Sequence, residues 1–257
     1  MTFNKIGWCH FTVGFWSGCT EVSTACDNCY AREMLQNRFG LVTWGAKQPR
    51  RPSLENAAKE LRRINNKAKR DGIRYRVFIN SASDTFDAEV PDEWRDALFE
   101  SIRQAPHIDA LVLTKRPTLA RRYRESGFAD EKQAHRTQWP PNLHLGVTIE
   151  TPQYLWRIGE MPIAGGIRFV SIEPMLATFL PCDVAEIVRR VGWVIVGGER
   201  DRDFRAMDMG SVRLVRDACR LAGVPFYFKQ MAGVNPKDEQ IPEDLRIREF
   251  PEGWAQR

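Results

Sequence analysis

The feature that most constrains the fold is a series of six short apolar runs, rich in β-branched residues, which begin at Tyr75, Ile108, Leu143, Ile167, Gly192 and Val224. Each run is almost continuously apolar, which is typical of strands that helices cover on both faces, as in parallel sheets. A seventh candidate strand lies near residues 11–15, and apolar residues at helical spacing fill 53–70, 91–105 and 209–223. Repeated strand–helix units of this number favour a partial or complete α/β barrel over the alternative, a doubly wound open sheet.

Length and composition indicate one folded unit. The 257 residues suffice for a single barrel domain over 1–257, with a C-terminal extension from about residue 231. Hydrophobic residues make up 43% and charged residues 28%, which excludes a disordered composition. No apolar run approaches the about 18 residues needed to cross a bilayer, and the amino terminus lacks a secretory pattern. We therefore expect a cytoplasmic protein with no membrane partner, whose net charge of +5 mildly attracts polyanions.

Polar residues follow every predicted strand. Because the carboxyl ends of parallel strands meet at one edge, we expect these residues to form one ligand site. The candidate binding residues there are Asn80, Ser81, Asp84, Lys115, Glu150, Glu173, Gly197, Gly198 and Glu199. The two glycines would let a ligand approach the backbone, and Lys115, beside Arg116, suits a carboxylate or a phosphate. The chain has no G-x-x-x-x-G-K-[ST], G-x-G-x-x-G or G-x-S-x-G motif, which argues against nucleotide-triphosphate, dinucleotide and serine-hydrolase functions.

Three of the six cysteines lie close together in the stretch GCTEVSTACDNCYARE. Six residues separate Cys19 from Cys26, and two separate Cys26 from Cys29. In a reducing cytoplasm such spacing indicates metal or redox chemistry more than disulfides. A structural zinc ion needs a fourth ligand, which Cys9 or His10 could supply, whereas a [4Fe–4S] cluster held by three cysteines leaves one iron open. Unligated structural thiols are the remaining alternative.

An open iron would give these cysteines a catalytic use. S-adenosylmethionine can fill that position through its amino and carboxylate groups, and one electron then cleaves its sulfonium bond to leave a 5'-deoxyadenosyl radical. The cysteine loop, residues 18–30, follows the first candidate strand and precedes a helix expected to begin around Tyr30. This places the loop at the mouth of a parallel barrel. From the residues alone, the iron–sulfur, zinc and unligated alternatives stay open.

The chain resembles the bacteriophage-associated three-Cys-motif family of radical S-adenosylmethionine-like proteins, which is distantly similar to spore photoproduct lyase. The resemblance rests on GCTEVSTACDNCYARE, VFINSASDTFDAEVP, LVLTKRP, GVTIE, FVSIEP, WVIVGGE and GVPFYFKQ. It implies a partial (β/α)6 barrel of the radical SAM kind, a [4Fe–4S] cluster on Cys19, Cys26 and Cys29, and S-adenosylmethionine at the barrel mouth. Two departures stand out: the six-residue first spacing, where the most widespread motif has three, and GGERD, where relatives tend to read Gly-Gly-Glu-Ser-Gly.

Individual roles follow as hypotheses. Glu199 would accept from the cofactor's amino group or contact its ribose, with a salt bridge to an arginine as the alternative. Asn80, Ser81 and Asp84 would suit ribose hydroxyls or the methionyl carboxylate. Tyr30 would shield the cluster, stack on adenine, or simply pack. These residues are candidates for cofactor binding, and the sequence identifies no catalytic residue.

Substrate evidence in the sequence is thin. Basic residues at 47–51, 59–70 and 121–124, with Trp44 and Trp139 in two long loops, predict a positive, aromatic rim for DNA or a nucleotide. We therefore expect an enzyme that modifies, rearranges or repairs a nucleobase or a modified thymidine in phage DNA, in the host cytoplasm, with an electron donor such as flavodoxin or ferredoxin. The alternatives are a non-catalytic zinc-binding, nucleic-acid-binding protein, and radical chemistry on a small metabolite or peptide.

Overall fold

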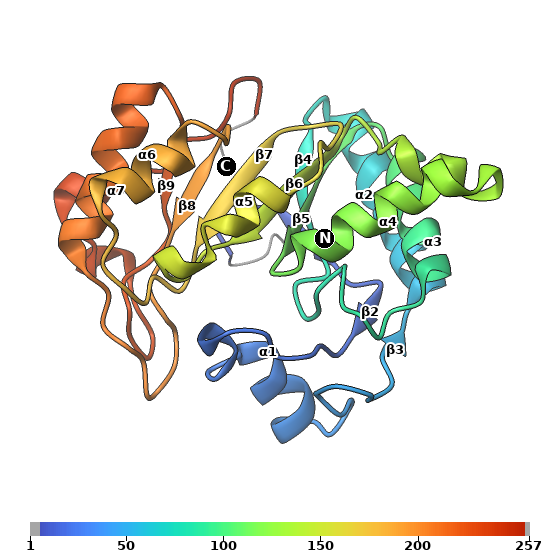
Figure 1. Ribbon diagram of the computed structural model, residues 1–257, viewed down its shortest axis with the longest axis horizontal. Helices are drawn as coiled ribbons and strands as arrows, with labels where there is room; N and C mark the ends of the chain where they lie inside the picture. The colour runs from blue at the N-terminus through green and yellow to red at the C-terminus, as the bar shows by residue number, and fades with distance from the viewer. Residues whose placement is uncertain (1–5, 255–257) are drawn as a thin grey trace.

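A parallel sheet forms the centre of the molecule. The structure, a computed structural model, describes residues 6–254. Within them, seven parallel strands lie in the order β1-β4-β5-β6-β7-β8-β9 (Figure 1). Their bounds are β1 (Phe11–Val13), β4 (Tyr75–Ile79), β5 (Ile108–Thr114), β6 (Leu143–Thr148), β7 (Arg168–Ile172), β8 (Val194–Val196) and β9 (Phe226–Phe228). All six predicted strands and the candidate seventh are confirmed, and the order is that of an α/β half-barrel in which each strand follows its neighbour in the chain.

A helix connects each pair of neighbouring strands. These helices are α2 (Leu54–Asp71), α3 (Asp92–Arg103), α4 (Pro117–Ala129), α5 (Trp156–Glu160), α6 (Pro181–Val188) and α7 (Met209–Ala222). Ser53 occupies the N-cap position of α2, but its side chain makes no capping hydrogen bond. The helix α7 ends at Gly223, as predicted, with φ +66° in the left-handed region that glycine adopts without a steric penalty.

The two faces of the sheet contact different partners. Along each strand, alternate side chains such as Val77, Val170 and Val196 pack against the helices in the main hydrophobic core. The opposite set faces the interior of the half-barrel, where Trp8, Leu111, Phe169, Trp193 and Tyr227 form an aromatic-rich inner cluster. Trp8 precedes β1 and Trp193 precedes β8, so this cluster lies toward the amino ends of the strands.

The C-terminal segment closes the β9 edge of the sheet. The amide of Phe228 donates to the carbonyl of Ile247 at 2.9 Å, and Tyr227 pairs with Arg248 in an antiparallel bridge. Trp254 then packs edge-on against Trp193, with ring centroids 5.3 Å apart. The segment therefore contributes both to the sheet and to the inner cluster.

The cysteine-bearing segment lies outside the sheet. It is anchored by a two-stranded antiparallel ribbon, β2 (Trp16–Ser17) with β3 (Arg51–Pro52). Between these strands run a short 3-10 helix, η1 (Thr24–Cys26), the turn of α1 (Tyr30–Arg32), and a π-helical continuation, η2 (Glu33–Arg38). The helix predicted around Tyr30 thus begins there, but it becomes π-helical after one turn. In Figure 1 this blue segment lies below the sheet. No helix in the described part of the chain is long and apolar enough to span a membrane.

Candidate functional site

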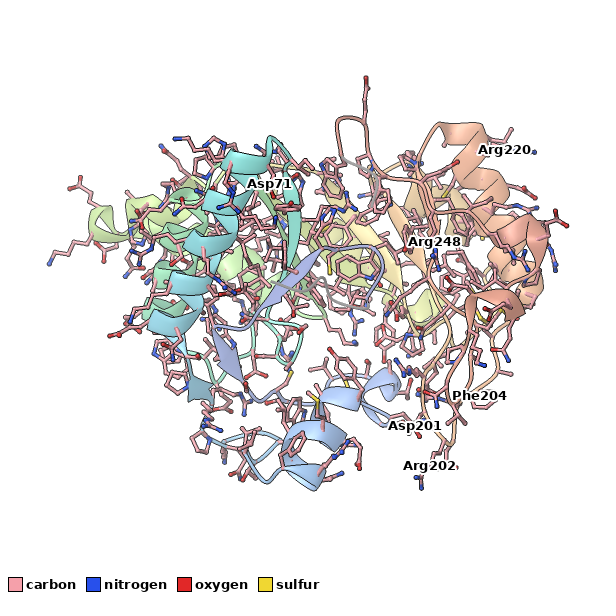
Figure 2. The ribbon with its side chains drawn as sticks, turned by 180° about the vertical axis from the view of Figure 1, so that it is seen from behind. Asp71, Asp201, Arg202, Phe204, Arg220 and Arg248 are labelled. Carbon is pink, nitrogen blue, oxygen red and sulfur yellow. The ribbon has the colours of Figure 1, made fainter. Side chains whose placement is uncertain are left out.

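The cysteine loop, residues 18–30, crosses the mouth of the half-barrel and is bonded to segments that follow four of its strands. Residues after β4, β5, β6 and β8 each contact it. The contacts are Thr20 N to Asp87 Oδ2 (2.8 Å), Arg116 to the Thr20 carbonyl, Ser23 to Glu150, Arg205 Nη1 to the Thr24 carbonyl (3.0 Å), Asn28 Nδ2 to the Asp203 carbonyl (3.3 Å), and Tyr30 Oη to the Ser81 carbonyl (2.6 Å). Figure 2 shows Asp201, Arg202 and Phe204, which belong to the loop after β8, beside the blue segment that carries the cysteines. The three cysteines are therefore held at the carboxyl ends of the strands.

Cys19 lies against a guanidinium group. Nη1 of Arg116 is 3.6 Å from its Sγ atom. Burial raises the pKa of the Cys19 thiol to about 12, and the charge of Asp84 adds to the rise while that of Arg116 opposes it. The thiol is therefore protonated at neutral pH, and a metal that binds it as a thiolate must displace this proton.

A buried network of charged side chains holds Cys19 and Thr20 in place through hydrogen bonds. It consists of Arg50, Asp84, Asp87 and Arg116, whose side chains are all at most 8% exposed. Arg116 pairs with Asp84 at 2.9 Å and with Asp87 at 3.1 Å, and Arg50 pairs with Asp87 at 2.8 Å. Burial alone would raise the pKa of Asp87, but Arg116 and several hydrogen bonds outweigh it and hold that pKa below its usual range. Asp87 is therefore charged, and both carboxylates are paired with arginines.

Sequence reasoning missed Asp87 and misplaced Arg50. The spacing of Asp84 and Asp87 after the β4 strand was the available signal, because two carboxylates so close at a strand end require cations nearby. Arg50 was expected on a basic rim, but it is 5% exposed and donates to Asp87 and to the Thr20 hydroxyl. It therefore does not contribute to that rim.

Cys26 and Cys29 complete the thiol set. Cys26 ends η1, with Sγ 3.8 Å from the Ser23 hydroxyl, and Cys29 is the N-cap residue of α1. All three thiols are partly buried and none forms a disulfide. Three soft sulfur donors on one loop match the ligand preference of an iron–sulfur cluster.

A closed zinc site is not assembled in the structure. Within residues 6–254, no three His, Cys, Asp or Glu side chains are placed to hold one metal ion. The candidate fourth ligands precede β1: Cys9 is buried in the inner cluster, and His10 Nδ1 accepts from the Arg76 amide at 2.9 Å. Zinc would need four ligands at about 2.0–2.3 Å. The three loop thiols are likewise not placed as one metal site in these residues, so the choice between zinc and an iron–sulfur cluster stays a prediction.

Several predicted binding residues at the first strand ends have partners within the chain. Asn80 adopts a left-handed φ of +56°, and its side chain accepts from the Phe15 amide at 2.8 Å. Asp84 accepts from Thr114, from the Lys115 amide and from Arg116. The Lys115 ammonium, by contrast, is half-buried and has no hydrogen bond or ion pair within residues 6–254. It is the cation in this group that remains available to a ligand.

The acidic residues at the later strand ends are also paired. Glu150 is fully buried and bonds to Arg157 at 2.6 Å as well as to Ser23. Both Glu199 oxygens accept from Arg205; burial alone would raise the pKa of Glu199, but these bonds outweigh it and lower that pKa. The salt bridge considered as the alternative for Glu199 is thus present.

The two glycines after β8 differ in what approaches them. A Cβ atom on Gly198 would lie 2.1 Å from the backbone nitrogen of Ala232, so its close approach is made by the chain itself. A Cβ atom on Gly197 would instead lie between Glu173 and Lys229, which form an ion pair. A cofactor-binding role for the predicted residues stays a prediction.

A family model described as a protein of unknown function, DUF5131, matches residues 3–250. The chain belongs to the DUF5131 family. No curated protein matches it. The phage association inferred from the motifs stays a prediction.

Among solved structures, the chain is similar to a cysteine-to-serine mutant of spore photoproduct lyase, at 11% identity and a TM-score of 0.54, over 89% of this chain and 79% of that chain. A tyrosine-to-phenylalanine mutant of the same lyase follows at 11% and 0.49, over 90% and 81%. A double mutant with bound AdoMet and dinucleoside spore photoproduct gives 12% and 0.46, over 82% and 61%. The first of these matches shows a shared fold, a partial parallel α/β barrel.

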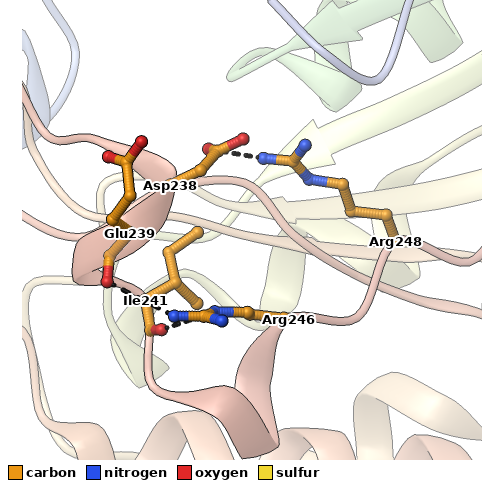
Figure 3. Close-up of a pocket in the computed structure, with 5 residues that line it drawn as sticks. All are labelled: Asp238, Glu239, Ile241, Arg246 and Arg248. Atoms are coloured by element: carbon orange, nitrogen blue, oxygen red, sulfur yellow. Dashed lines mark hydrogen bonds and ion pairs between the residues drawn. The ribbon is translucent and has the colours of Figure 1, made fainter.

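The predicted aromatic rim of this DUF5131 chain needs a second correction. Trp139 is 7% exposed, stacks on Phe86 with ring centroids 5.9 Å apart, and meets Phe99 edge-on at 5.0 Å. It belongs to the core and is not available to a nucleic acid. A shallow surface pocket lies elsewhere, lined by Asp238, Glu239, Ile241, Arg246 and Arg248 of the C-terminal segment (Figure 3). None of the predicted site residues lines it.

Proposed function

We propose that this protein is a radical S-adenosylmethionine enzyme, with a [4Fe–4S] cluster on Cys19, Cys26 and Cys29. The observation that carries the proposal is the position of the cysteine loop. The loop bears three free thiols and is hydrogen-bonded to the segments that follow the strands of a parallel half-barrel. The fold shared with spore photoproduct lyase supports it. When bound, such a cluster supplies one electron to S-adenosylmethionine and thereby a 5'-deoxyadenosyl radical.

The chain's own residues would position the co-substrate. Lys115 would bind the methionyl carboxylate, since it follows β5 directly and its ammonium has no partner in the described residues. Tyr30, which is exposed beside Cys29 and fixed through its hydroxyl to Ser81, would cover the adenine or the cluster. Asn80, Gly197, Gly198 and Glu199 would act mainly through the backbone that they shape, because their side chains are absent or engaged. The Ser81 hydroxyl would bind a ribose hydroxyl or the methionyl carboxylate.

The substrate we propose is a nucleobase or a modified thymidine in DNA, with phage DNA as a candidate source and flavodoxin or ferredoxin as the electron donor. The net charge of +5 and the exposed Lys47 and Arg51 near the cysteine loop support an anionic partner. The burial of Arg50 and Trp139 favours a second candidate, a small metabolite or peptide, because the rim for a polymer loses two of its predicted members.

Anaerobic purification and reconstitution test the chemistry. We expect a brown protein with about four irons, as a [4Fe–4S] cluster requires, that forms 5'-deoxyadenosine from S-adenosylmethionine on reduction. Cys26→Ala should abolish both properties. Cys182→Ala is the matched control, because Cys182 is an exposed free thiol on α6 and should be dispensable. A colourless protein with one zinc ion would contradict the proposal. Salt-sensitive binding of DNA separates the two substrate candidates.

A further inference from the structure

Glu173 and Lys229 form an ion pair across the end of the strand that lies between them. Glu173 follows β7, Gly197 follows β8 and Lys229 follows β9, and the strand registers place the three residues in one row. A Cβ atom on Gly197 would be 3.3 Å from Cγ of Glu173 and 3.5 Å from Cβ of Lys229. Because position 197 has no side chain, the two charged side chains can meet.

The pair lies on the inner face of the half-barrel. Phe169, Ile195 and Tyr227 on the same three strands belong to the inner cluster. Glu173, Gly197 and Lys229 continue this set at the strand period of two, so their side chains face the interior and not the helices. Both residues come directly after their strands, at the carboxyl ends of β7 and β9, and their side chains stay 19% and 20% exposed.

Stability does not explain an ion pair at this position. Removing two charges from water costs about as much free energy as their attraction returns. Neither side chain has another hydrogen bond or ion pair in the described part of the chain. The Lys229 ammonium therefore keeps two N–H donors and the Glu173 carboxylate keeps a free oxygen, side by side.

We propose that Glu173 and Lys229 bind the edge of a planar heterocycle that carries a carbonyl group next to an N–H group, as pyrimidine bases do. The ammonium donates to the carbonyl oxygen and the carboxylate accepts from the N–H. Phe78 on β4 and Leu113 on β5 are partly exposed on the inner face and supply apolar surface for a flat ring. The proposal rests on the proposed function, since this ring is the substrate of the radical, and it gives Glu173 a role toward substrate instead of cofactor.

A matched pair of probes tests the recognition. Thymidine and N3-methylthymidine differ at the N–H group that Glu173 would accept from. Titration calorimetry on the reconstituted protein should show at least about tenfold weaker binding of the methyl analogue, because the carboxylate loses its donor. Equal affinity for the two probes, or no binding of thymidine, overturns the proposal.

Variants locate the recognition on this pair. Lys229→Met should weaken thymidine binding by about tenfold or more, and Glu173→Gln should reduce the discrimination between the probes. Gly197→Ala keeps both charges but inserts a methyl group between them, so it should weaken binding in the same direction without removing either charge. Arg213→Met is the control, because it breaks an exposed pair with Asp244 and should leave thymidine affinity unchanged. Thermal unfolding of each variant verifies that it is folded, and unchanged affinity in folded Lys229→Met overturns the proposal.

Failure of this inference is distinguishable from failure of the proposed function. The unaltered protein is assayed in parallel for iron and for 5'-deoxyadenosine. If both are present and thymidine does not bind, the recognition proposal alone falls. If both are missing, the proposed radical chemistry falls with it.

Discussion

Nη1 of Arg116 lies 3.6 Å from Sγ of Cys19, and the same guanidinium pairs with both Asp84 and Asp87. One of the three proposed cluster ligands thus receives a charge-assisted hydrogen bond from a side chain held by two carboxylates. Hydrogen bonds to ligand sulfurs stabilise the more negative, reduced cluster, and raise its reduction potential. Arg116 therefore positions Cys19 and would raise the reduction potential of a cluster bound there.

Replacing Arg116 should change the potential of the cluster. Arg116→Gln should lower the midpoint potential by roughly 50 mV, the one-electron equivalent of about 1 kcal/mol, as measured by redox titration with electron paramagnetic resonance. Because this variant leaves two buried carboxylates without that cation, it should also destabilise the fold by about 3 kcal/mol or more. Arg116→Lys keeps a positive charge and is the control. A potential that is identical in all three proteins would contradict a role toward Cys19.

Because Gly198 lies close to the Ala232 backbone, we expect the fold to be destabilised by any side chain at position 198. The methyl group of Gly198→Ala would meet the Ala232 backbone nitrogen at 2.1 Å, and backbone cannot move aside as a flexible side chain can. We expect a loss of about 1–3 kcal/mol in the free energy of unfolding, measured in urea. Gly233→Ala is the matched control, because its nearest neighbour, Cβ of Pro236, would lie 3.9 Å away. Equal losses in the two variants would show that the close approach at Gly198 is not rigid.

The ionisation of Asp96 on α3 should make the stability of the fold depend on pH. Asp96 accepts from Arg136 at 2.8 and 2.7 Å and from the Tyr123 hydroxyl at 2.7 Å. Burial alone would raise the pKa of Asp96, but the bonds from Arg136, Tyr123 and His135 outweigh it and hold the pKa below its usual range. Since the folded pKa lies below the unfolded value of about 3.9, this carboxylate stabilises the fold above that pH, and its contribution is lost as pH falls through the folded pKa.

Urea unfolding at a series of pH values measures this contribution. Between about pH 5 and pH 3, the free energy of unfolding should fall more steeply in the unaltered protein than in Asp96→Asn, which cannot ionise. Asp96→Asn should be less stable at pH 7. Parallel profiles for the two proteins would mean that Asp96 carries no pH-linked stability.

The strands were predictable from the sequence because strands buried on both faces consist of almost continuous apolar residues, a pattern visible within each short segment. The runs at Tyr75 and Leu143 are apolar except for Arg76 and His144 and the polar residues that end them, and they became β4 and β6. The polar strand ends followed from topology, since parallel strands share one carboxyl edge. The cysteine loop could likewise be placed at the barrel mouth, because it follows the first strand.

What could not be predicted depends on partners distant in the chain. Trp139 occurs in a polar segment and its burial is decided by Phe86 and Phe99, which come from other elements. Arg50 was indistinguishable from a surface cation until Asp87 was placed beside it. The Glu173–Lys229 pair required the registers of three strands and the missing side chain of Gly197. A sequence pattern within one segment cannot predict these contacts, because each depends on residues from other segments.

The most direct test of the central claim is electron paramagnetic resonance of the anaerobically reduced protein before and after addition of S-adenosylmethionine. Three cysteine ligands leave one iron able to accept the amino and carboxylate groups of S-adenosylmethionine, so the account predicts a [4Fe–4S] spectrum that changes on addition. A protein that holds a single zinc ion, or a cluster spectrum that S-adenosylmethionine leaves unaltered, would contradict it.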